Sequence, residues 1–411
     1  MTASASLDGG PAARTEHAFP CLDGARALAA TAVVGTHVAF WTGLEPSTLL
    51  GRAFARMDVG VPIFFVLSGF LLSRPLFLAA AEGRAAPRPA AYLWRRALRI
   101  LPAYWLTISV ALLFLPGNRD AGVADLLRHL LLVQNYTTGP MGEGLTHTWS
   151  LSTEVSFYLV LPLLGAGLAR LSGPRPDRPT RILAALGGAT LLGLGWLVWV
   201  WWDRPISAPM DLWLPSFAGW FGAGMAFAVL SVSDPAWRPV RVVRELGASL
   251  PTCWTAAGVL FWFSTTSFAG PLDLSVPSPG QAVTKNVLYL GVAAFLVLPL
   301  VFGNQRAGLT RRALGGPLVT SLGEISYGLF LVHVPVIVAG YALLGQLPFT
   351  GNFLLVLITT WLISVGIATA VYAAVERPAR RWRGLVPDRP RRTASASTEA
   401  TTAETATSTR T

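Results

Sequence analysis

The stretch Ala25–Trp41, "ARALAATAVVGTHVAFW", indicates the fold class, because it is apolar enough to form a membrane helix. It nevertheless carries a cation and an imidazole. Arg26 stands at its start and His37 lies well inside it. At about 100° per residue, the eleven steps between them make three helical turns plus roughly 20°. The spacing predicts both side chains on one face of a helix, roughly 16 Å apart along its axis.

The composition of the whole chain predicts an integral membrane protein. Of its 411 residues, 53% are hydrophobic and 13% are charged, and the mean hydropathy is +0.52. A soluble domain carries about 25% charged residues. The net charge of +11 does not indicate nucleic-acid binding, because the Arg residues lie in short loops between apolar runs. Cys21 and Cys253 form no disulfide framework and no metal-ligand spacing, so we expect neither a metal site nor a permanently bound cofactor.

Ten apolar runs are long enough to form transmembrane helices, which makes the predicted fold all-α. They lie near 25–42, 59–81, 100–115, 148–169, 182–202, 212–231, 248–268, 286–303, 322–345 and 352–375. If the N-terminus is cytoplasmic, 25 cations fall on the inside and 6 on the outside, with Arg74 within the second run. This asymmetry predicts a multi-pass plasma-membrane protein with both termini in the cytoplasm.

Two polar tails flank the predicted transmembrane domain, 21–384. Residues 1–20 contain no apolar segment typical of a cleavable signal, so the first run is expected to act as the anchor. Residues 385–411 end in a low-complexity stretch that is predicted to be disordered and cytoplasmic.

Three predicted spans place an ionisable group at a similar depth. His37 and Glu154 each lie about six residues from an outer helix end, roughly 9 Å below the outer surface. His333 reaches a similar level from the inner side. Ionisable groups inside spans are costly and often functional, so these residues predict a shared cavity open to the outside.

A second polar set lies toward the cytoplasm. Arg95, Arg96 and Arg99 precede the third run, and Arg95 and Arg99 are spaced to share a helix face. Asp23 and Arg26 belong at the same surface, and Arg74 sits in the inner half of the second run. Because guanidinium groups bind phosphates bidentately, these residues predict an anion site that faces the cytoplasm.

Each of these groups also has a structural interpretation. The three Arg residues before the third run can be topological anchors, and Glu154 can cap or pair within the bundle. His333, followed by Pro335, resembles a core histidine at a kink, and Glu376 is spaced to form an interfacial ion pair with Arg377. No Gly-x-Ser-x-Gly elbow surrounds Ser68 or Ser73. Little weight falls on the histidines of the tail and outer loops, His17, His129 and His147.

Taken together, these segments resemble the membrane-bound acyltransferase family 3, the bacterial integral-membrane O-acyltransferases of envelope polysaccharides and some macrolides. The resemblance covers about 20 to 383 and is carried, in family order, by "LDGARALAATAVVGTHVAFW", "DVGVPIFFVLSGFLLSR", "WRRALRILPAYW", "TWSLSTEVSFYLVLP", "ISYGLFLVHVP" and "VERPARRW". Two departures are visible. One carboxylate follows the Trp-Ser-Leu element where the family often has two. The residue directly before His333 is a valine, where the family often has an aromatic residue.

The resemblance implies an acyl-CoA co-substrate in the cytoplasm and an acceptor hydroxyl on a glycan or small molecule. Arg26, Arg95, Arg96 and Arg99 would then hold the phosphates of the donor. His37 would act as general base or as an acyl-accepting nucleophile, and Glu154 would orient it or stabilise its charged form. An acetyl or another short acyl group is expected. Supporting roles would fall to Asp23, Ser68, Arg74, Tyr327 and His333.

Two other classes of function remain open at this point. A transporter or exporter of a polar envelope precursor would also use deep His and Glu residues as a proton relay. A non-catalytic partner could organise an assembly complex for polysaccharides. The cytoplasmic Arg cluster combined with Arg26 and His37 on one face favours the enzyme, because a transporter does not need that cluster.

Overall fold

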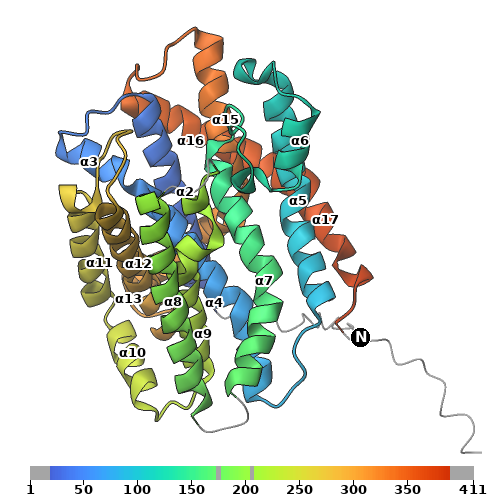
Figure 1. Ribbon diagram of the computed structural model, residues 1–411, viewed down its shortest axis with the longest axis vertical. Coiled ribbons are helices and arrows are strands. Elements are labelled where there is room, and N and C mark those ends of the chain that lie inside the picture. Colours follow the sequence, from blue (N-terminus) through green and yellow to red (C-terminus); the bar gives the residue numbers. More distant parts are fainter. Residues whose placement is uncertain (1–18, 173–176, 204–207, 389–411) are drawn as a thin grey trace, which may run out of the picture.

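The computed structural model describes residues 19–172, 177–203 and 208–388, and within these ranges every regular element is helical. The predicted all-α membrane fold is therefore confirmed. The prediction of disorder for residues 385–411 lies almost wholly outside these ranges. Figure 1 shows the long helices side by side, with α3 (Leu49–Ala55) and α6 (Val123–Leu130) at one end and α10 (Arg238–Ala248) and α13 (Gly308–Leu314) toward the other.

All ten predicted apolar runs form helices. They are α2 (Pro20–Trp41), α4 (Gly60–Ala81), α5 (Pro89–Phe114), α7 (Trp149–Ser172), α8 (Arg178–Asp203), α9 (Ala218–Val232), α11 (Leu250–Ser264), α12 (Pro279–Phe302), α15 (Ser326–Leu344) and α16 (Phe353–Val371). By length and composition, eight helical segments of the described chain qualify as membrane spans, or nine if α10 and α11, bent by 87°, count as one. Helix α2 is not among them, although its 22 residues give a length of about 33 Å, enough to cross the hydrocarbon layer.

The largest difference from the predicted boundaries is in α5. The third apolar run was expected to begin near residue 100, but the helix begins at Pro89 and includes all three of its Arg residues. Proline is favourable at the first helical position, where its missing N–H is not needed. Arg95, Arg96 and Arg99 are therefore helical, and their directions are fixed by α5.

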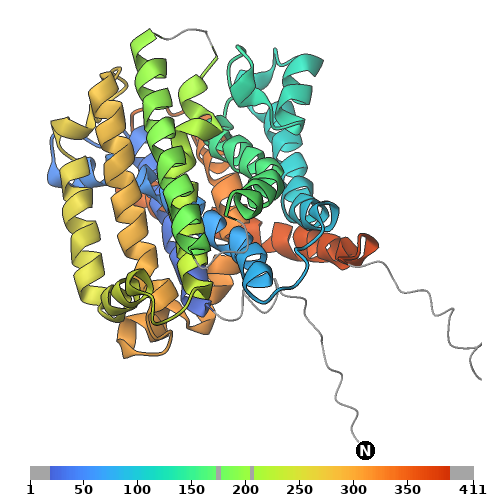
Figure 2. The same cartoon turned by 60° about the horizontal axis from the view of Figure 1, so that its bottom comes forward.

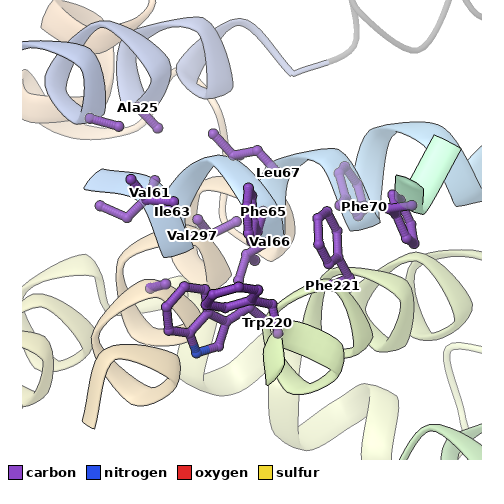
Figure 3. Close-up of a cluster of buried hydrophobic side chains, with 14 of the residues drawn as sticks. Ala25, Val61, Ile63, Phe65, Val66, Leu67, Phe70, Trp220, Phe221 and Val297 are labelled. Atoms are coloured by element: carbon purple, nitrogen blue, oxygen red, sulfur yellow. The ribbon is translucent and has the colours of Figure 1, made fainter. Parts of the chain in front are cut away.

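Helix α4 lies at the centre of the bundle, between α2 and α9. Figure 3 shows its apolar side chains against both neighbours. The ring of Phe65 stacks on that of Phe221 with centroids 4.4 Å apart, and Phe157 of α7 stacks on the other face of Phe221 at 4.1 Å. Small residues permit this close approach. A Cβ atom on Gly69 would lie 2.2 Å from the Phe221 carbonyl oxygen, and one on Gly224 would lie 2.0 Å from that of Val66.

The C-terminal segment runs beside α5, as the red and cyan ribbons show in Figure 2. A π-helix, Tyr372–Glu376, follows α16 and leads into α17 (Arg377–Ala379). The indole N–H of Trp94 on α5 donates to the Trp382 carbonyl at 2.9 Å. The segment is thereby held against the half of α5 that carries the Arg residues.

Candidate active site

A narrow cavity of about 100 Å³ lies between α2, α4, α5, α7 and α15. Three guanidinium groups line it, those of Arg26, Arg96 and Arg99. Arg26 comes from α2, and Arg96 and Arg99 lie three residues apart on α5. The remaining polar lining comes from the other three helices: Ser68, Ser150, Glu154, Tyr158 and Tyr327. We call this space the Arg cavity.

Arg95 does not line the Arg cavity. Its guanidinium donates to the Asp388 carboxylate at 2.9 Å, on the C-terminal segment that runs beside α5. The structure therefore places Arg96 and Arg99 together in this cavity and separates Arg95 from Arg99, with which it was expected to share a helix face. Positions three and four apart both fit a helix face. The ion pair with Asp388 of the C-terminal segment holds Arg95 outside the cavity, so the pair that lines the cavity is Arg96 and Arg99.

Arg74 also points away from the cavity. Its guanidinium donates to the Ser231 hydroxyl of α9 at 3.1 Å and lies 5.3 Å from the centre of the Phe19 ring. Asp23 lies one turn before Arg26, and its carboxylate is 3.9 Å from the Arg26 guanidinium. Of the predicted supporting residues, neither Asp23 nor Arg74 lines the Arg cavity, but Asp23 pairs with Arg26, which does.

Glu154 belongs to the Arg cavity. Its carboxylate accepts a short hydrogen bond from the Ser68 hydroxyl, which joins α7 to α4. Within the described residues, no hydrogen bond connects Glu154 with His37. The predicted acid/base set of His37, Glu154 and His333 is therefore divided between two places. Tyr327 also lines the cavity, and its hydroxyl donates to the Ile100 carbonyl of α5 at 2.9 Å.

Glu376 is buried behind the Arg residues. It lies in the π-helix, pairs with Arg380 at 3.3 Å, and is close enough to Arg99 and Arg26 for their charges to act on it. The predicted interfacial pair with Arg377 is wrong, because the partner is Arg380 and the carboxylate is 1% exposed. A single-turn π-helix of this kind often occurs at functional sites.

The second polar group is a cluster of three histidines: His37 on α2, His333 on α15, and His147 on the short turn Thr146–Thr148 before α7. The ring centroids lie 4.9 Å apart for His37 and His333, 4.9 Å for His147 and His333, and 6.1 Å for His37 and His147. His147 is 3% exposed. We call these residues the histidine cluster.

The hydrogen bonds assign the neutral tautomer of each ring, because a backbone carbonyl can only accept. His37 Nδ1–H donates to the Val33 carbonyl at 2.9 Å, and His333 Nδ1–H donates to the Phe330 carbonyl at 2.6 Å. The lone pair of His333 Nε2 then faces the same His37 Nδ1–H at 3.1 Å, so that this one hydrogen is shared between the Val33 carbonyl and His333. In this arrangement His37 Nε2 is the ring nitrogen that remains available as a base.

His147 is the member of the cluster that sequence reasoning missed. Its Nε2–H donates to the Leu331 carbonyl at 3.1 Å, and its buried Nδ1 has no hydrogen-bond partner in the described structure. The residue directly precedes Thr148 and Trp149 in the "HTWSL" element. That position, at the outer end of a predicted span, is the signal that could have marked it.

Phe330 connects the two groups. It lines the Arg cavity, and its ring centroid lies 5.2 Å from that of His147 and 5.8 Å from that of His333. The cavity thus extends from the Arg side chains, past Ser68 and Glu154, to an aromatic ring in contact with the histidine cluster. The described residues contain no group of three or more His, Cys, Asp or Glu side chains arranged to hold a metal ion.

Comparison with known proteins assigns this chain to a family. A family model described as an acyltransferase domain matches residues 19–374. The chain belongs to this acyltransferase family. The acyltransferase MdmB of Streptomyces mycarofaciens is 26% identical over 396 residues, covering 89% of this chain and 92% of its own length. The O-acetyltransferase OatA of Staphylococcus aureus is 24% identical over 384 residues, 88% of this chain and 57% of OatA.

A third relative, nodulation protein 10 of Rhizobium leguminosarum bv. viciae, is 24% identical over 361 residues, 79% of this chain and 82% of its own length. The chain spans little more than half of the length of OatA. No solved structure matches the chain. These findings confirm the family resemblance. The protein is a multi-pass membrane acyltransferase, and the plasma membrane fits its bacterial relatives.

Proposed function

We propose that this acyltransferase moves a short acyl group from cytoplasmic acyl-CoA to a hydroxyl of a glycan or a secondary metabolite. The observation that carries the proposal is the Arg cavity, which ends at Phe330 against the histidine cluster. A cluster of guanidinium groups suits the phosphates of coenzyme A. An imidazole suits the proton transfer that a hydroxyl acceptor requires.

The donor would enter from the end of the bundle where Arg26, Arg96 and Arg99 lie. Their guanidinium groups would bind the donor's phosphates, and the long pantetheine arm would carry the thioester toward His37. Arg26 and His37 lie on one helix, roughly 16 Å apart along its axis, so α2 would fix the distance between anchoring and reaction. Ser68 and Glu154 would line the path between them.

His37 would act as the general base. Its Nε2 takes the proton of the acceptor hydroxyl while the oxygen bonds to the thioester carbonyl carbon. The carbon–sulfur bond then breaks, and the proton passes from His37 to the departing sulfur. His333 Nε2 accepts from His37 Nδ1–H at 3.1 Å and would stabilise the imidazolium that forms. It would act like the third residue of a catalytic triad, which orients the base. Alternatively, His37 Nε2 attacks the thioester carbonyl carbon itself and the carbon–sulfur bond breaks to release the coenzyme A thiolate. The acyl-histidine then passes its acyl group to the acceptor oxygen, and the hydroxyl proton goes to the thiolate.

The proposed direction of transfer depends on orientation, which the cation distribution predicts with both termini in the cytoplasm. Single-cysteine labelling of intact cells tests it. Gly280→Cys, at the start of α12, should react with an impermeable maleimide, and Leu309→Cys on α13 should not. The chain's own Cys21 and Cys253 are buried and give little background. The reverse labelling pattern would invert the proposed sides of donor and acceptor.

The function itself is tested by mass spectrometry of glycans and small metabolites from cells with the gene, without it, and with His37→Gln. A mass difference of one acyl group that requires His37 supports the proposal and names donor and acceptor. A transporter would change where a compound accumulates but not its mass. An acyl group that persists with His37→Gln at normal levels of the protein would contradict the assigned base.

A further inference from the structure

A second pocket, of about 550 Å³, lies at the opposite end of α2 from Arg26. Three segments that are far apart in the sequence form it: the end of α2 with α3, the loop at 272–275, and Phe349 after α15. All three are loops or helix ends on the side predicted to be extracellular. We call this space the outer pocket.

The outer pocket reaches the level of His37. Thr36 and Phe40, one residue before and three residues after His37, both line it. At about 1.5 Å per residue, both lie within about 5 Å of His37 along the helix axis. Along α2, the Arg cavity and the outer pocket therefore lie on opposite sides of the level of His37, and His37 itself lines neither of them.

Two aromatic rings build one wall of the outer pocket. Phe40 and Phe349 meet edge to face with centroids 5.1 Å apart, and both remain substantially exposed. Phe349 has a φ of 65°, which is unfavourable for a residue with a side chain, and its N–H donates to the Trp41 carbonyl at 2.8 Å. A Cβ atom on Gly43 would lie 2.7 Å from the Phe349 carbonyl oxygen, so only glycine permits this approach. The wall is held in place before any ligand arrives.

Among the described residues that line the outer pocket, Asp273 alone carries a charge. Hydrogen bonds from the side chain and backbone of Ser275 lower the pKa of its carboxyl group, and the Ser275 backbone N–H donates to Asp273 Oδ1 at 2.9 Å. Among the described residues it forms no ion pair. An ionised carboxylate beside an apolar wall complements a ligand with an apolar face and a basic amine. A phosphorylated or uronic acid ligand would meet repulsion there.

We propose that the outer pocket binds the acceptor, through a hydroxylated ring that packs on Phe40 and Phe349 and carries a basic amine toward Asp273. This inference rests on the proposed acyl transfer, because it makes the outer pocket the place from which a hydroxyl reaches His37. An amino-sugar-like group has this chemistry. Neutral sugars would bind more weakly, and acidic sugars would be excluded.

A binding experiment without donor or turnover tests the inference. Leu274→Cys places a thiol in the lining of the outer pocket, and Val276→Cys places one in the same loop outside the lining. In lipid nanodiscs at slightly acidic pH, the labelling rate with uncharged N-ethylmaleimide is measured with hexyl β-D-glucosaminide, hexyl β-D-glucoside, hexyl β-D-glucuronide or hexanol. The glucosaminide should slow labelling of Leu274→Cys several-fold and the glucoside less, with little effect from the other two.

The controls separate recognition from general apolar binding. Val276→Cys should be labelled at the same rate in every case. Adding Asp273→Asn to Leu274→Cys should reduce protection by the glucosaminide to that given by the glucoside. Equal protection by hexanol, protection by the glucuronide, or no protection by any compound would overturn the inference. Protection by the glucosaminide together with no acyl transfer in any assay would support ligand binding in the outer pocket and contradict the proposed function.

Discussion

His333 Nε2 lies 3.1 Å from His37 Nδ1, although 296 residues separate the two in the sequence. The contact joins α15 to α2. Each ring also donates to a carbonyl of its own helix, so both are fixed in direction. His37 therefore has the environment of an oriented base, which a lone polar residue on an apolar face would not have.

The first prediction concerns His37. His37→Gln should leave insertion and folding intact, because glutamine has a similar size and can still form hydrogen bonds. Acyl transfer should fall by about 10²–10⁴-fold, since an amide cannot accept a proton at neutral pH. The measurement is the rate at which labelled acetyl groups pass from acetyl-CoA to an acceptor extract. Near-normal transfer by this variant would end the proposed mechanism.

His333 is expected to act through His37. His333→Leu removes one of the two acceptors that face His37 Nδ1–H and leaves the Val33 carbonyl, which makes the protonated form of His37 less favourable. The rate should fall, and the acidic limb of the pH–rate profile should move to lower pH. His333→Gln retains an acceptor and should recover part of both. If His333→Leu lowers only the amount of folded protein and leaves the pH profile unchanged, His333 is a packing residue.

The Arg cavity leads to a prediction with a control from the same helix. Arg96→Ala and Arg99→Ala should each raise the apparent KM for acyl-CoA by about ten- to a hundredfold, because a charge-assisted contact contributes roughly 1.5–3 kcal/mol. Arg95→Ala should change it little, since Arg95 forms a partly exposed pair with Asp388, of a type worth about 0–1 kcal/mol. An unchanged KM in all three variants, with less protein in the membrane, would show that the Arg residues act as topological anchors.

The sequence predicts the helices well because hydrophobic runs and Arg-rich loops are local signals. It predicts α2, and with it the placement of Arg26 and His37 on one helix. It does not predict which α5 cation faces the cavity, because the docked C-terminal segment engages Arg95 through Asp388. The placement of Glu154 depends in the same way on Ser68 of α4, which is 86 residues earlier.

His147 shows why the histidine cluster could not be read completely. The residue follows an outer loop, and loops are usually solvent-exposed. It is buried because a short turn, Thr146–Thr148, directs it toward α15, where it donates to Leu331 across 184 residues. No periodic pattern in the sequence encodes such a contact.

The crossing of α4 and α9 predicts a sensitive position for stability. A Cβ atom on Gly224 would lie 2.0 Å from the Val66 carbonyl oxygen and 2.6 Å from the Phe70 backbone nitrogen. Gly224→Ala should therefore force the helices apart and lower the melting temperature in detergent. Gly187→Ala on α8 is the control, because a Cβ atom there meets nothing within 4 Å. Alanine is the better helix former, so that variant should melt at the same temperature or slightly higher.

The last prediction concerns pH and the loop between α5 and α7. His129 on α6 is fully buried, and its Nδ1–H donates to the Asp125 carbonyl at 2.8 Å. The Gly142 N–H donates to His129 Nε2 at 3.4 Å. Protonation of Nε2 would therefore place its N–H opposite the Gly142 N–H and break this hydrogen bond. Burial lowers the pKa of His129 below its usual value of 6.5.

The sign of the effect follows from that direction. Above about pH 6.5 the ring is neutral whether the loop is packed or released, so the full stability of the loop is present. As the pH falls below that value, the released loop binds a proton that the packed loop does not, and packing is progressively lost. Hydrogen exchange of the peptide that contains Gly142 should therefore become faster relative to its intrinsic rate as the solution is acidified. His129→Gln should remove this pH dependence, and a wild-type peptide whose protection is the same on both sides of the transition would contradict the assigned role of His129.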